Sequence, residues 1–85
     1  MTRTMPKTVL ITGGAKRIGK AITESLAASG WATAIHYFGS SDEAAALAKS
    51  INAANGNATI FSADLSDPNE TTDLIPAVVD TLGPI

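Results

Sequence analysis

A short apolar run leads directly into a glycine-rich turn near the start of the chain. The run covers residues 8–11, and the turn, residues 12–19, reads TGGAKRIG. A helical pattern follows, with Ile18, Ile22 and Leu26 spaced to share one face. A buried strand that enters a helix through such a turn brings backbone N–H groups to the positive helix N-terminus, which is typical of phosphate binding. The feature favours an α/β fold with an anionic ligand at the turn.

Strand and helix patterns alternate along the rest of the chain. We expect strands at residues 8–12, 31–37 and 57–63, and helices at about residues 17–29, 41–54 and 68–82. Alternation of this kind implies a parallel sheet with right-handed crossovers. The predicted fold is a Rossmann-like α/β sheet of strand order 3-2-1 with flanking helices. Residues 1–85 are expected to form the incomplete N-terminal part of one doubly wound domain, with residues 83–85 entering a fourth strand.

Local signals predict where the helices begin and end. Gly30 and Gly56 follow the first two helices, and Ser40 precedes Glu43 in a capping-box pattern. Residues 67–70, which read DPNE, give a second cap signature with Asp at the cap and Pro at the first helical position. Pro76 falls inside the third helix and predicts a kink or break there.

Composition excludes several classes of protein. The chain has no cysteine, so it holds neither a disulfide nor a thiolate metal site, and its single histidine, His36, is expected to pack inside a strand. All six basic residues lie in residues 1–49, without the basic strip of a nucleic-acid binder. No apolar run has the length of a signal peptide or membrane span. We therefore expect a cytoplasmic protein with neither a nucleic-acid nor a membrane partner.

Three interpretations of the glycine turn compete. Residues 14–20 match the G-x-x-x-x-G-K part of a P-loop, but Ala21 stands where a nucleoside triphosphatase needs Ser or Thr for Mg²⁺. A plain strand-to-helix turn without a ligand is the second interpretation. The third is a dinucleotide site, although the common G-x-G-x-x-G spacing is not met because Gly13 and Gly19 are six residues apart.

Residues 12–19 resemble the T-G-x-x-x-G-x-G motif of the short-chain dehydrogenase/reductase family, with Arg17 in place of the middle glycine. This form is similar to that of the pteridine reductase branch. The resemblance covers essentially the whole chain but roughly the first third of the family's length. It implies an NADP(H)-dependent oxidoreductase that reduces a carbonyl or pteridine-like substrate. The family's catalytic Tyr-x-x-x-Lys has no match, because Ser41 follows Tyr37 at that spacing, so no catalytic residue is predicted.

The end of the second strand favours NADP(H) over NAD(H). NAD-binding relatives of this fold carry an acid there for the ribose 2′-hydroxyl, whereas this chain has none before Asp42. The Arg17 guanidinium can pair bidentately with a 2′-phosphate. Ser40 and Ser41 are candidate phosphate ligands, with helix capping as the alternative role. Gly39 stands where the pteridine reductase branch has an arginine, which removes one cation.

The end of the third strand carries the remaining candidates. By the resemblance, Asp64 bonds the adenine ring and Leu65 packs on it, whereas the alternative is an ordinary turn. Tyr37 and Phe38 are expected to pack at the sheet edge and border the adenine pocket. The predicted cofactor-binding residues are Gly13, Ala15, Lys16, Arg17, Ile18, Gly19, Tyr37, Phe38, Ser40, Ser41, Asp64 and Leu65.

Two hypotheses for the chain remain open. In the first, it is the N-terminal cofactor-binding part of a homo-oligomeric reductase that acts on a small molecule. In the second, it is a non-catalytic nucleotide-binding fragment that self-associates through the exposed edge of its first strand.

Overall fold

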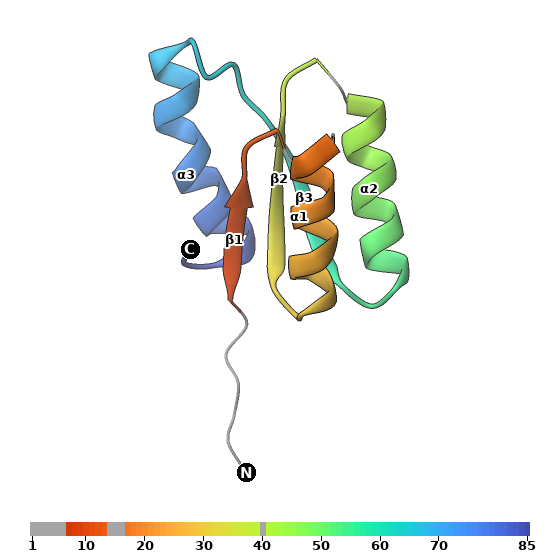
Figure 1. The fold of residues 1–85 in the computed structure, drawn as a ribbon. Helices are drawn as coiled ribbons and strands as arrows, with labels where there is room; N and C mark the ends of the chain where they lie inside the picture. The colour runs from red at the N-terminus through yellow and green to blue at the C-terminus, as the bar shows by residue number, and fades with distance from the viewer. Residues whose placement is uncertain (1–6, 14–16, 40) are drawn as a thin grey trace.

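The fold is a three-layer α/β arrangement, seen in a computed structural model that describes residues 7–13, 17–39 and 41–85 (Figure 1). The parallel sheet has the order β1-β2-β3 and is formed by β1 (Thr8–Ile11), β2 (Ala32–Tyr37) and β3 (Asn57–Ser62). The helices are α1 (Arg17–Ala28), α2 (Ser41–Ala53) and α3 (Pro68–Leu82). Helices α1 and α2 cover one face of the sheet and α3 covers the other (Figure 1). The predicted Rossmann-like fold and its strand order are confirmed.

Each face of the sheet has its own apolar core. Ile35 and Ala34 are adjacent in β2 and fully buried, and they belong to different cores because strand side chains alternate between faces. Ile35 packs with the buried stripe of α2, which consists of Ala44, Leu47, Ala48 and Ile51 as predicted. Ala34 packs with Ala63 and with Leu74 and Val78 of α3.

The apolar residues that share one face of α1 are not its most buried residues. Ile18, Ile22 and Leu26 share a face, but Ile18 is 78% exposed and Ile22 is also exposed. The buried residue of α1 is Thr23, and its hydroxyl donates to the Gly19 carbonyl at 2.8 Å. Thr23 therefore lies on the side of α1 that faces the protein interior, and the most exposed apolar residues, Ile18 and Ile22, lie outside that side.

The predicted helix ends are confirmed in part. After α1, the Gly30 N–H donates to the Ala27 carbonyl and the Trp31 N–H to the Leu26 carbonyl, both at 3.1 Å, which is the Schellman pattern. After α2, the left-handed residue is Asn55, with a φ of 68°, and not Gly56. A Cβ at Gly56 would lie 2.9 Å from the Ile51 carbonyl oxygen, so glycine is required there because the two backbone segments lie close together.

Helix α3 begins as predicted but continues through its proline. The Asp67 carboxylate accepts the Asn69 N–H at 2.9 Å, and Pro68 is the first helical residue. The helix is unbroken at Pro76, so the predicted break is absent. Residues 83–85 carry no strand. The Thr8 hydroxyl donates to the Leu82 carbonyl at 3.2 Å, and this bond connects the end of α3 to the start of β1.

Candidate functional site

The candidate site lies at the carboxyl ends of the strands. Gly13 follows β1, Phe38 follows β2 and Ala63 follows β3. The strands are parallel, so these segments meet at one edge of the sheet (Figure 1). Ligands of open α/β sheets bind in this position, outside the strand ends and against helix N-termini.

Gly13 shapes the turn after β1. Its φ is 62°, a left-handed conformation that glycine adopts without strain, and a Cβ there would meet no atom within 4 Å. Its N–H donates to His36 Nδ1 at 3.1 Å, so this amide faces the protein interior. Gly13 can therefore assist a phosphate by leaving space rather than by donating its own N–H. Ala15 and Lys16 lie outside the described residues.

Arg17 begins α1 in an unusual backbone conformation. Its φ is 50°, and it is one of two non-glycine residues with a positive φ in the described part of the chain. Residues with a Cβ rarely adopt this left-handed backbone conformation, and the residues that do are concentrated at ligand sites. Ile18 is exposed beside it, and Gly19 is half-buried in the same helical turn.

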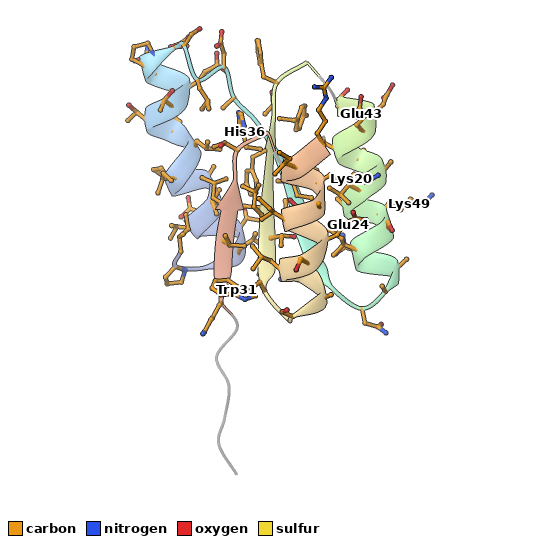
Figure 2. The ribbon with its side chains drawn as sticks, viewed as in Figure 1. Lys20, Glu24, Trp31, His36, Glu43 and Lys49 are labelled. Carbon is orange, nitrogen blue, oxygen red and sulfur yellow. The ribbon has the colours of Figure 1, made fainter. Side chains whose placement is uncertain are left out.

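A charged groove of about 600 Å³ lies between α1 and α2. Its lining residues are Arg17, Lys20, Glu24, Glu43, Ala46, Leu47 and Ser50. Figure 2 shows Lys20 and Glu24 on α1 and Glu43 near the start of α2. The groove brings two cations, Arg17 and Lys20, together with the carboxylates Glu24 and Glu43. Arg17 faces the groove across from the first turn of α2, which contains Glu43 and begins at Ser41.

The end of β2 presents aromatic and small residues. Tyr37 is half-buried and its carbonyl accepts the Ala63 N–H at 3.1 Å, whereas Phe38 is 63% exposed at the same edge. Gly39 has a φ of 84° and turns the chain toward α2. Ser41 is exposed at the start of α2. Ser40, the other candidate ligand, lies outside the described residues.

Asp64 makes the hydrogen bonds of an ordinary turn, which is the alternative to its predicted contact with adenine. Its Oδ1 accepts the Ser66 hydroxyl at 2.6 Å and the Ser66 N–H at 3.0 Å. These bonds favour the charged form, so the side-chain and then the backbone bond of Ser66 lower the pKa of Asp64 from its usual 3.8. The Asp64 N–H donates to Glu70 Oε1 at 3.1 Å, so Glu70 fixes this turn instead of completing the predicted capping box. Leu65 is exposed beside it.

His36 is the feature of this edge that sequence reasoning missed. It is buried, as predicted, but both ring nitrogens bond backbone groups of the neighbouring segments. Its partners are Gly13 and Ala63, at sequence separations of 23 and 27 residues. No local pattern could indicate bonds over such separations.

Two kinds of feature are absent from the part of the chain that the structure describes. There, no group of three or more His, Cys, Asp or Glu side chains could hold a metal ion. None of the helices described has the length and apolar character needed to cross a membrane.

The family model for short chain dehydrogenases matches residues 7–85. The chain belongs to the short-chain dehydrogenase family. It is 38% identical over 79 residues to the short-chain dehydrogenase/reductase homolog YusS of Bacillus subtilis, covering 93% of this chain and 72% of YusS. It is 33% identical over 79 residues to 3-oxoacyl-[acyl-carrier-protein] reductase FabG of Staphylococcus aureus, covering 93% of this chain and 32% of FabG.

A solved structure of the same family has the same fold. The crystal structure of FolM alternative dihydrofolate reductase 1 from Brucella suis, in complex with NADP, matches with a TM-score of 0.86 and 45% identity. The match covers 94% of this chain and 31% of FolM. This short-chain dehydrogenase chain therefore spans most of YusS but about a third of FabG and FolM.

Proposed function

We propose that the chain forms the NADP(H)-binding part of a short-chain reductase. The observation that carries the proposal is the position of Arg17, at the start of α1 and across a groove from the first turn of α2. A 2′-phosphate at this edge would meet the guanidinium, the Ser41 hydroxyl and the positive N-terminus of α2. The complex of FolM with NADP supports the same assignment.

The segment after β2 supports NADP(H) over NAD(H). Its described residues, Tyr37, Phe38 and Gly39, carry no carboxylate that would repel a 2′-phosphate. Asp42 and Glu43 lie in the first turn of α2, where carboxylates offset the helix dipole. The positive charge of Arg17 offsets the negative charge of these two carboxylates.

We infer the rest of the cofactor site from the other strand ends. The shape of the Gly13 turn leaves room for the pyrophosphate, with Ala15, Lys16, Ile18 and Gly19 completing it. The adenine ring would lie near Tyr37, Phe38, Asp64 and Leu65, whose side chains are half-buried or exposed at the sheet edge. Ser40 would share the 2′-phosphate.

The proposed substrate is a carbonyl compound or a pteridine-like ring. FabG is named as a 3-oxoacyl reductase and FolM as an alternative dihydrofolate reductase, and both reactions add hydride to a C=O or C=N bond. The names of these relatives favour a reductase over a non-catalytic fragment. We further propose that the protein acts as a homo-oligomer, which light scattering of the purified protein would test.

Cofactor titration is the decisive experiment. We expect calorimetry to give about tenfold tighter binding of NADPH than of NADH, because one bidentate phosphate contact supplies the difference. Arg17→Ala should weaken NADPH binding and change NADH binding little. Lys49→Ala is its matched control, since Lys49 is an exposed cation of α2 outside the groove lining (Figure 2). Equal affinities for the two cofactors would refute the NADP(H) assignment, and no binding of either would refute the proposed function.

The reaction class is tested separately by turnover. NADPH oxidation by the protein that carries this sequence would be followed with 3-oxoacyl thioesters and with dihydropteridines. Turnover of either class would support the reductase assignment and identify the substrate class. Binding of NADPH without turnover of any carbonyl or pteridine would contradict it.

A further inference from the structure

His36 connects three segments at the cofactor edge. Its side chain is 5% exposed. Nδ1 lies 3.1 Å from the Gly13 backbone nitrogen, and Nε2 lies 2.8 Å from the Ala63 carbonyl oxygen. Gly13 immediately precedes the undescribed part of the glycine turn, and Ala63 immediately precedes Asp64. One ring on the middle strand thus bonds the segment after β1 and the segment after β3.

The partners fix the protonation pattern of the ring. A backbone N–H can only donate and a carbonyl can only accept. Nδ1 must therefore be the acceptor from Gly13, and Nε2 must carry the hydrogen that Ala63 accepts. The imidazole is neutral with its hydrogen on Nε2, because a cationic ring would direct a second N–H at the Gly13 N–H.

The space on the Cβ side of Gly13 is open. A Cβ at Gly13 would meet no atom within 4 Å, so no side chain presses against the turn from that side. Within the described residues, the Gly13 N–H donates its side-chain hydrogen bond to His36 Nδ1. The bond also fixes the direction in which the Gly13 amide points.

We infer that His36 is a positioning residue of the dinucleotide site, an inference that rests on the proposed NADP(H) function. Through Nδ1 it sets the orientation of the Gly13 amide, which borders the proposed pyrophosphate site. Through Nε2 it keeps Gly13 in register with Ala63, next to the proposed adenine contacts. His36 is buried beneath the site and acts on the cofactor through Gly13.

Two conservative variants separate the two bonds. An asparagine amide reaches about as far as Nδ1, so His36→Asn can still accept from the Gly13 N–H but loses Ala63. A glutamine amide reaches about as far as Nε2, so His36→Gln can still donate to the Ala63 carbonyl but loses Gly13. His36→Leu loses both bonds. Each variant leaves the part-buried Gly13 N–H, the buried Ala63 carbonyl or both without the His36 partner, so all three should lower the melting temperature.

All three variants should lose stability, but they should differ from one another in their affinity for NADPH. Loss of the Gly13 bond should weaken NADPH binding about tenfold in His36→Gln and at least as much in His36→Leu. The affinity of His36→Asn for NADPH should stay within about threefold of the wild-type value. Calorimetric titration of the full chain gives these affinities, and thermal denaturation gives stability. Equal losses of affinity in the asparagine and glutamine variants would overturn the inference, and this comparison stands even if His36→Leu does not fold.

Nuclear magnetic resonance of the wild-type chain tests the bond without cofactor. We expect ¹⁵N signals of an unprotonated Nδ1 and a protonated Nε2, with the Gly13 amide protected from hydrogen exchange. A protonated Nδ1, or a Gly13 amide that exchanges freely, would overturn the role of His36 even if NADPH binds. The expected tautomer in a chain that binds no NADPH would instead refute the proposed function and leave His36 without a cofactor role.

Discussion

Arg17 offers a test in which stability and cofactor affinity move in opposite directions. Its φ of 50° costs a residue with a Cβ about 1–2 kcal/mol. Glycine adopts this conformation freely but loses about 0.5–1 kcal/mol more chain entropy on folding. The difference predicts that Arg17→Gly raises the free energy of unfolding by up to about 1 kcal/mol. In a chain of this size that corresponds to a rise of about 4–8 °C in melting temperature.

Arg17→Ala is the matched comparison. Alanine keeps the Cβ and therefore the strain, and the Arg17 side chain is exposed, so its unfolding free energy should change by less than about 0.5 kcal/mol. Both variants remove the guanidinium, so both should bind NADPH about tenfold more weakly while NADH binding changes little. Thermal denaturation followed by circular dichroism gives stability, and calorimetric titration gives the two affinities.

Two results would refute this reasoning independently. If Arg17→Gly is no more stable than Arg17→Ala, the left-handed conformation carries no strain and its proposed link to a ligand site is lost. If both variants lose affinity for NADPH and for NADH equally, Arg17 contacts a part that the two cofactors share, and its proposed role at the 2′-phosphate is wrong. Lys49→Ala should leave stability and both affinities unchanged.

Three further predictions concern the fold. Val78→Ala should lower the free energy of unfolding by about 2 kcal/mol because Val78 is 0% exposed, and Val79→Ala should cost less than half as much at 39% exposure, as urea denaturation would show. Pro76→Ala should raise it by about 1–3 kcal/mol, since it restores an N–H inside the unbroken α3, and the same assay checks this. Ser66→Ala should raise the pKa of Asp64 toward 3.8 in a ¹³C carboxyl titration. Because folding depresses that pKa, the Asp64 carboxylate stabilises the fold above its unfolded pKa, and this contribution disappears as pH falls through the folded value.

Local sequence signals predicted the elements because each depends on neighbouring residues. The Asp67 cap, the Gly30 end of α1 and the buried stripe of α2 all follow from spacings within one or two turns. The strand order follows from alternation and handedness. Pro76 shows the limit of a local rule, because the predicted break did not occur in a helix that buries Leu74 and Val78 on either side of it.

Features that depend on the approach of distant segments were not predictable in this way. The apolar residues of α1 share one face, but the structure buries Thr23, because the side of a helix that contacts the sheet depends on distant segments. His36 has the same explanation: its burial follows from an apolar strand, whereas its bonds to Gly13 and Ala63 need the ends of three strands in one place. Periodicity identifies which residues can face the core but not which backbone groups meet there. The predicted cofactor residues come from a short motif and the strand ends in the sequence, whereas a residue that orients their backbone becomes visible only through its hydrogen bonds.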